Sequence, residues 1–243
     1  MRVFPWWERA LLRLLPGHCP LCLGVPLRGM PWCAACFAAL PRNRAACLGC
    51  AEPLPGGARG LHCSRCLSAP PLMSSSRAPL VFCDEIAWLV RRFKFEGDFR
   101  AGRLLVELAL TVLIESDERD WGARFDVLLA VPSDAVRVRE RGFDHADWLA
   151  RRFARRVGMP LLRARRLRAT GSQRGLGRRA RQRNLTEVFS LAISPPPRVL
   201  LFDDVMTTGA TFEALAQCCF DAGCLEVAAL ALARTPRSLP TRR

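Results

Sequence analysis

The sequence has no long apolar run, and no stretch approaches the roughly 20 apolar residues that a membrane-spanning helix needs. The first 16 residues contain tryptophan and leucine, but Glu8, Arg9 and Arg13 interrupt them. They lack the continuous apolar region and the small-residue cleavage site of a signal peptide, so we expect a short amphipathic helix over residues 1–16. These absences predict a cytoplasmic protein without membrane insertion.

Lysine is nearly absent: Lys94 is the only lysine among 37 basic residues, and the net charge is +15. The arginines are concentrated, because residues 137–183 contain 16 of them against three acidic residues. A local excess of positive charge predicts an anionic partner. That partner is either the phosphate groups of a small molecule or a nucleic-acid backbone.

Cysteine is abundant near the start of the chain, where four CxxC pairs follow one another within 48 residues. In a cytosolic chain such pairs indicate zinc sites rather than disulfides. Four thiolates complete one tetrahedral Zn²⁺, so eight predict two structural zinc ions. Sequential and interleaved pairing of the knuckles use the same ligands, and both remain open. The predicted ligands are Cys19, Cys22, Cys33, Cys36, Cys47, Cys50, Cys63 and Cys66.

The rest of the chain alternates between strand and helix patterns. We expect a zinc module over residues 17–67, a linker rich in proline and serine over 68–79, one large domain over 80–233 and a flexible tail over 234–243. The alternation predicts an α/β fold with a mostly parallel sheet and helices on both faces. The expected strands are 80–83, 125–131, 198–202 and 227–232, and the expected helices are 86–93, 101–114, 146–157 and 211–222.

One segment combines a buried strand, two carboxylates and a Thr/Gly turn that opens a helix. Ligands of open α/β sheets bind at the carboxyl ends of strands, and a helix N-terminus stabilises a phosphate through its N–H groups and its dipole. We therefore expect phosphate at residues 207–211, where Gly209 permits close approach. Asp203 and Asp204 suit sugar hydroxyls or Mg²⁺. A phosphate beside a diol indicates a ribose-5-phosphate.

The segment VLLFDDVMTTGAT (199–211) resembles the phosphoribosyl pyrophosphate (PRPP) signature of the type I phosphoribosyltransferases. The CxxC pairs that precede it resemble the double zinc ribbon of the ComF competence family, which includes the GntX-like proteins. RGFDHA (141–146), KFEGD (94–98) and the spacing of Gln173, Leu176, Arg178, Arg181 and Asn184 also resemble motifs of that family. The resemblance implies a type I phosphoribosyltransferase sheet after a zinc-ribbon module. It implies a PRPP site made of Asp203, Asp204, Thr207, Thr208, Gly209, Ala210 and Thr211.

The sequence departs from the family at several positions. Asp144 and His145 stand where the family has Asn-Gln, Ser133-Asp134 stands where Leu-His often follows, and Phe82 replaces a tyrosine. Purine-salvage relatives carry Asp where this chain has Thr207, which argues against a purine acceptor activated by that group. The phosphate loop is intact, but the acceptor and the catalytic residues stay unassigned.

If PRPP binds, cationic side chains should hold its pyrophosphate and Mg²⁺ should accompany it. The candidates for pyrophosphate contact are Lys94, Arg137, Arg139 and Arg141.

Residues 163–183 contain nine arginines, no acidic residue and no aromatic residue. This composition suits a loop that closes on PRPP, and it equally suits an arm that grips single-stranded DNA, although DNA-binding platforms usually add stacking aromatics. The candidates for DNA contact are Arg174, Arg178, Arg179, Arg181 and Arg183.

We therefore predict a PRPP-binding, phosphoribosyltransferase-like protein of competence or DNA utilisation, with single-stranded DNA and competence or DNA-processing proteins as partners. One alternative is an active phosphoribosyltransferase with an unidentified acceptor. The other is a non-catalytic zinc-ribbon adaptor that binds DNA.

Overall fold

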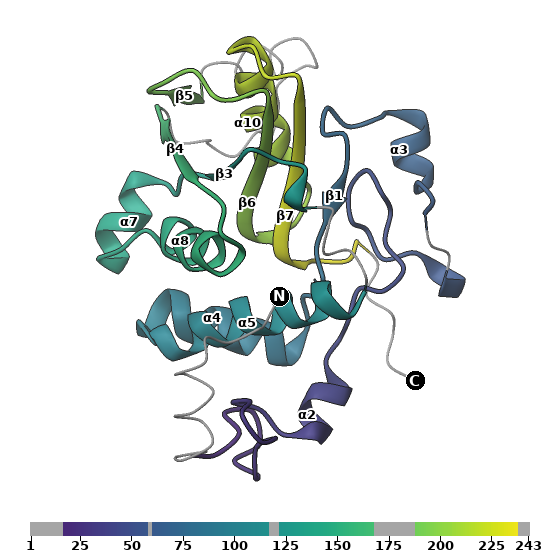
Figure 1. Ribbon diagram of the computed structural model, residues 1–243, viewed down its shortest axis with the longest axis vertical. Coiled ribbons are helices and arrows are strands. Elements are labelled where there is room, and N and C mark those ends of the chain that lie inside the picture. The colour runs from purple at the N-terminus through teal and green to yellow at the C-terminus, as the bar shows by residue number, and fades with distance from the viewer. Residues whose placement is uncertain (1–16, 58–59, 117–121, 168–187, 238–243) are drawn as a thin grey trace.

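A computed structural model describes residues 17–57, 60–116, 122–167 and 188–237. The helix expected over residues 1–16 and most of the expected tail lie outside these ranges. Figure 1 shows a central sheet with helices on both faces and two cysteine-rich segments below and beside it.

The sheet has seven strands within the described residues, in the order β1-β7-β6-β3-β4-β5, and β2 also pairs with β7. All pairs are parallel except β4 with β5. This agrees with the predicted α/β class and mostly parallel sheet. The strands are β1 (Ser76–Arg77), β2 (Leu80–Val81), β3 (Val127–Ala130), β4 (Leu161–Arg166), β5 (Phe189–Leu191), β6 (Arg198–Met206) and β7 (Glu226–Arg234).

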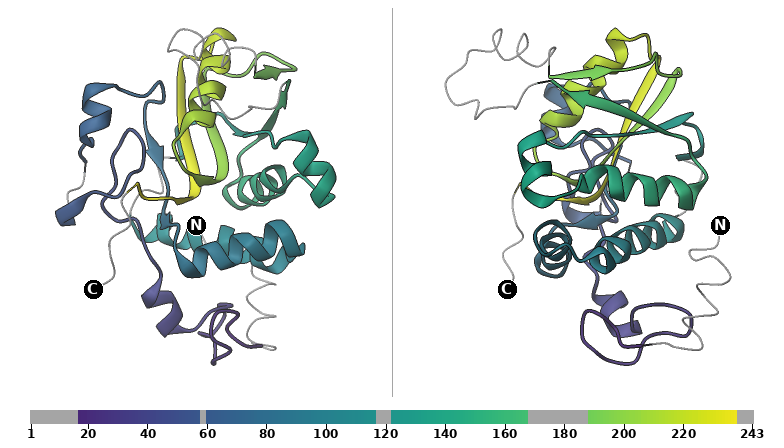
Figure 2. Two further views of the ribbon diagram at one scale, coloured as in Figure 1. Left: turned by 180° about the vertical axis from the view of Figure 1, so that it is seen from behind. Right: turned by 90° about the vertical axis from the view of Figure 1, so that its left-hand side faces the viewer.

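The central strands are buried because both of their faces are covered by helices. On one face, α4 (Asp84–Glu96), α5 (Phe99–Glu115) and α8 (His145–Val157) pack against Leu128, Leu200 and Leu230. On the other face, α10 (Ala210–Asp221) packs against the alternate residues Leu129, Leu201 and Ala229. The two apolar clusters follow from the two-residue period of a strand. Figure 2 shows the two layers of helices from the side.

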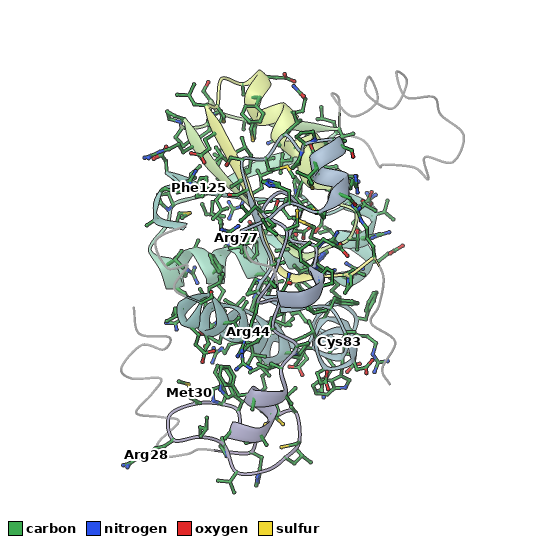
Figure 3. The ribbon with its side chains drawn as sticks, turned by 90° about the vertical axis from the view of Figure 1, so that its right-hand side faces the viewer. Arg28, Met30, Arg44, Arg77, Cys83 and Phe125 are labelled. Carbon is green, nitrogen blue, oxygen red and sulfur yellow. The ribbon has the colours of Figure 1, made fainter. Side chains whose placement is uncertain are left out.

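The cysteine-rich module is divided into two ribbons that contact different parts of the domain. The first ribbon contains α2 (Ala34–Ala39), and its Cys19 and Trp32 join the apolar cluster of α4 and α5. The second contains the short helices η1 (Pro55–Gly57) and α3 (Ser64–Ser68) and lies beside β1. Arg28 and Met30 of the first ribbon lie at one end of the molecule in Figure 3, and Arg77, on strand β1 of the sheet, lies near the middle of the molecule.

The structure differs from the expected segments at several places. Residues 68–79, expected to be a linker, include β1, and the Ser74 N–H donates to Val227 O at 2.8 Å. Arg234, expected to begin the tail, ends β7 and is fully buried. Short elements without a strong sequence pattern, namely β4, β5 and α7 (Ala135–Arg141), were not expected either.

Candidate functional site

The Thr/Gly loop lies at the carboxyl end of β6, where the chain turns into α10. Gly209 precedes the helix with φ of 84°, a left-handed conformation that favours glycine. Thr207, Thr208 and Thr211 are exposed. Within the described residues no hydrogen bond engages the backbone N–H of Thr207, Thr208 or Gly209. The loop thus presents backbone and hydroxyl donors at a helix N-terminus, as the sequence predicted.

Asp203 and Asp204 lie near the carboxyl end of β6, in unlike environments. Burial raises the pKa of Asp203 well above its usual value, and the neighbouring Asp204 carboxylate raises it further. Burial also raises the pKa of Asp204, but the adjacent Lys94 ammonium, His145 and the hydrogen bond with Asp203 together outweigh it, so the net shift of the pKa is downward. The negative charge is therefore held mainly on Asp204, which forms an ion pair with Lys94.

His145 lies beside the two carboxylates, and ligand atoms of His145, Asp203 and Asp204 lie within 4.8 Å of one another. Arg141 Nη1 lies 3.1 Å from His145 Nδ1. Because a guanidinium only donates, Nδ1 accepts and the ring proton sits on Nε2. Burial, aided by Lys94 and Arg141, lowers the pKa of His145 to about 4, although Asp204 raises it. The ring is therefore neutral at physiological pH.

Ser133 and Asp144, two of the positions where the sequence departs from the family motifs, form one hydrogen-bond network with His145. Ser133 Oγ donates to Asp144 Oδ1 at 2.8 Å and lies 3.4 Å from His145 Nδ1. Asp144 is also the N-cap of α8, where it accepts from the Asp147 N–H. The unusual carboxylate therefore holds the start of the helix and orients the serine toward the imidazole.

A cationic cavity of about 540 Å³ adjoins this cluster between α4 and α7. Three of the four predicted pyrophosphate contacts line it: Lys94, Arg137 and Arg141. Arg139 is exposed on α7 and is not among its lining residues. Phe95 and Phe143 line the cavity too, and the Arg141 guanidinium lies over the Phe95 ring at 4.8 Å. The structure thus brings most of the predicted cations to one hollow.

The eight paired cysteines form two groups with sequential pairing, and the four Sγ atoms of each group lie within 4.8 Å of one another. The Sγ atoms of Cys22 and Cys33 are 3.6 Å apart and those of Cys50 and Cys63 are 3.7 Å apart. A tetrahedral zinc with Zn–S bonds of about 2.3 Å separates its sulfurs by about 3.8 Å. The groups therefore fit structural zinc. The first centre is Cys19, Cys22, Cys33 and Cys36, and the second is Cys47, Cys50, Cys63 and Cys66.

Part of the arginine excess has a structural role. Arg152 and Arg156 hold the fully buried carboxylate of Glu107, which ties α8 to α5. Arg151 and Arg163 both pair with Asp147. The predicted DNA contacts Arg174, Arg178, Arg179, Arg181 and Arg183 lie outside the described residues.

Sequence reasoning missed Arg234, which reaches the phosphate loop from β7. Its Nη1 donates to Met206 O at 3.0 Å and also to Thr207 O. An arginine at the end of an apolar run carries no local pattern that distinguishes a buried side chain from an exposed one.

Sequence comparison identifies relatives along most of the chain. Residues 10–67 match the family model "Double zinc ribbon domain". The DNA utilization protein YhgH of Salmonella typhi is 30% identical over 226 residues, covering 91% of this chain and 98% of that protein. Competence protein F of Haemophilus influenzae is 31% identical over 179 residues, covering 71% and 78%.

A purine phosphoribosyltransferase from Pyrococcus horikoshii aligns with 56% of this chain and 78% of that chain, with a TM-score of 0.34 and 20% identity. The TM-score is too low for this similarity to support a function. In the described part of the chain, no helix combines the length and the apolar character needed to cross a bilayer.

Proposed function

Since this chain belongs to the family of competence protein F and the DNA utilization proteins, we propose that it binds PRPP and acts in competence or DNA utilisation. The segment of residues 203–211, which is the end of β6 and the loop that follows it, takes the ribose-5-phosphate part, and the cavity beside it takes the pyrophosphate. Asp203 or Asp204 would hold a Mg²⁺ that accompanies PRPP, and the ion would supply positive charge to stabilise the pyrophosphate.

The observation that carries this proposal is the adjacency of two unlike surfaces. The end of β6 and the loop after it offer carboxylates and backbone donors, whereas the neighbouring cavity offers Lys94, Arg137 and Arg141. The Lys94–Asp204 ion pair joins the two. PRPP has a diol and a phosphate at one end, which suit the carboxylates and the backbone donors. It has a pyrophosphate at the other end, which suits the cations of the cavity.

The residues present can assist departure of pyrophosphate from C1 of the ribose. Lys94 and Arg141 would stabilise the charge that develops on the leaving group, and arginine does so in a planar, bidentate manner. His145 is neutral, and its Nδ1 already accepts from Arg141, so only Nε2–H is available to a ligand. These residues support binding and leaving-group stabilisation, while the acceptor and its base stay unassigned.

The test is calorimetry of PRPP with Mg²⁺ on the zinc-loaded full chain. Replacing both carboxylates, Asp203→Asn with Asp204→Asn, should weaken binding at least about tenfold, because charge-assisted hydrogen bonds are lost. Asp126→Asn is the matched control, since Asp126 pairs with Arg198 at the opposite end of β6. Unchanged PRPP affinity in the double variant would show that the ligand binds elsewhere.

The second candidate function is binding of single-stranded DNA, favoured by the arginines of residues 137–183. The names of the relatives agree with it, but several of these arginines are engaged by Glu107 and Asp147. We therefore assign DNA contact to Arg174, Arg178, Arg179, Arg181 and Arg183, beyond the paired ones. PRPP binding does not depend on this assignment.

A further inference from the structure

Arg234 is a fully buried cation at the junction of three segments. It ends β7, and in Figure 1 the chain leaving β7, drawn in yellow, runs from the sheet toward the ribbon segments beside β1. A buried guanidinium is costly unless its donors are all engaged. Its partners therefore show what the fold uses it to hold together.

On one side Arg234 holds the start of the phosphate loop. Its Nη1 donates to Met206 O and Thr207 O, the last residue of β6 and the first of the loop. The backbone adds a parallel link, since the Thr235 N–H donates to Met206 O at 2.9 Å. The direction in which the chain leaves β6 toward Gly209 thus depends on this guanidinium.

On the other side Arg234 holds the second zinc ribbon. Its Nε donates to Cys50 O at 3.0 Å, and its Nη2 lies 2.6 Å from Glu52 Oε2. Cys50 is a ligand of the second centre, and Glu52 follows two residues later. The Cys47 N–H donates to Glu52 O at 2.8 Å, which closes the knuckle around the same residues.

We propose that Arg234 is a positioning residue through which the second zinc centre holds the phosphate loop, so that occupancy of that centre controls phosphate binding. The inference rests on the proposed function, because it assigns a regulator to the same loop. One side chain bonds a zinc-ligand residue and the loop at once, so a ribbon that unfolds without metal withdraws two of the partners that fix the guanidinium.

The first zinc centre provides an internal comparison. Its Cys19 and the nearby Trp32 pack in the cluster of α4 and α5, not against Arg234. Cys33 and Cys63 are equivalent positions, because each begins the second CxxC of its centre and each is the N-cap of a short helix. Loss of zinc from the two centres should therefore have different consequences.

The first experiment compares Cys63→Ser with Cys33→Ser by elemental analysis and PRPP calorimetry. Each variant should lose zinc from one centre. Cys63→Ser should bind PRPP about tenfold more weakly, whereas Cys33→Ser should stay within about twofold of the unmodified chain. Equal PRPP affinity in the two variants would overturn the inference.

The second experiment tests the arginine itself. Arg234→Met leaves Glu52 without its buried partner and destabilises the fold, so it is combined with Glu52→Gln to remove the uncompensated charge. The double variant should keep both zinc ions but bind PRPP about tenfold more weakly. Arg198→Met, which breaks an exposed ion pair at the far end of β6, is the control and should change affinity less than about twofold.

A third readout needs no ligand and separates the two proposals. Hydrogen exchange is measured at two hydrogen-bonded amides, Thr235, which donates to Met206 O, and Glu213, which donates to Gly209 O. Both should exchange faster in the double variant than in the Arg198→Met control, because the loop has lost its support. If the unmodified chain fails to bind PRPP, the proposed function is wrong. Hydrogen exchange alone then tests whether Arg234 connects the second zinc ribbon to the loop. Unchanged exchange with unchanged zinc content would refute the positioning role.

Discussion

Lys94 and Asp204 form an ion pair that joins the end of α4 to the end of β6. The side chain of Asp204 is almost fully buried, so its charge needs a partner before any ligand arrives. A pyrophosphate in the adjacent cavity would attract Lys94 and release Asp204 to accept a ribose hydroxyl. In the proposed function, the pair would therefore link recognition of the two ends of PRPP.

Lys94→Met tests that link. The variant should bind PRPP about tenfold more weakly, because the pyrophosphate loses a charge-assisted partner. Ribose-5-phosphate, which lacks the pyrophosphate, should be affected much less. Competition calorimetry with both ligands on the same protein measures the ratio, which cancels any general loss of stability. An equal loss for the two ligands would place Lys94 outside the pyrophosphate contact.

Gly209→Val should abolish most PRPP binding, since it adds a side chain where phosphate approaches and strains a positive φ. No heavy atom outside its chain neighbours lies within 4 Å of a Cβ built there, so the protein itself leaves room. Gly158→Val is the matched control, because Gly158 has φ of 72° in equally open space at the C-cap of α8. Similar losses of thermal stability with unequal PRPP affinity would confirm the role of the loop.

His145 should make stability fall as the solution becomes acidic. Its pKa is about 4 in the fold and about 6.5 in the unfolded chain, so its contribution is complete above pH 6.5 and declines as pH falls toward 4. Protonation of this group should lower the free energy of unfolding by about 1 kcal/mol at pH 5.5 compared with pH 7.5. Denaturant unfolding of His145→Gln should show a flatter pH dependence by that amount, and an identical slope would contradict the shift.

Two zinc ions per chain should be found by elemental analysis, in keeping with the two cysteine groups. Removal by a chelator should unfold the ribbons, because structural zinc supplies folding free energy. Circular dichroism and zinc content measured together check this. One equivalent after careful handling would reject one of the centres.

DNA binding, if the arginine-rich segment provides it, should be nearly independent of sequence and weaken steeply with salt. Joint charge reversal of Arg178, Arg179 and Arg181 should reduce it without unfolding the sheet. Fluorescence anisotropy with single-stranded oligonucleotides at several salt concentrations measures both effects. A triple variant with unchanged affinity would remove this segment from the interface.

The strongest sequence patterns predicted the elements that the structure shows. The apolar run before Asp203 predicted a buried strand, and the structure has β6 there. The CxxC pairs predicted two groups of four cysteines, and the structure has both. Sequence alone left the pairing open, since interleaved knuckles use the same ligands, and only their positions in space select sequential groups. Such patterns are predictable because local spacing alone generates them.

The elements that were missed depend on contacts between distant residues. β1 has only two residues and forms because it pairs with the edge of β7. Its Ser76 pairs with Ala229, which lies 153 positions later in the chain. The role of Arg234 arises from carbonyl groups at Cys50 and Met206 that are far away in the chain. Likewise, nothing in the sequence around His145 shows that it meets the carboxylates of β6. Tertiary packing decides these features, and local spacing does not encode it.

The short strand β1 has a consequence for how the chain can be divided. Ser76 pairs with Ala229, while its N–H and hydroxyl donate to Leu48 O and Gly49 O of the second ribbon. Any fragment that begins after β1 would expose part of the β7 edge and invite strand pairing between molecules. The sheet therefore depends on the segment that joins it to the second ribbon, and a fragment that contains the sheet without β1 should aggregate.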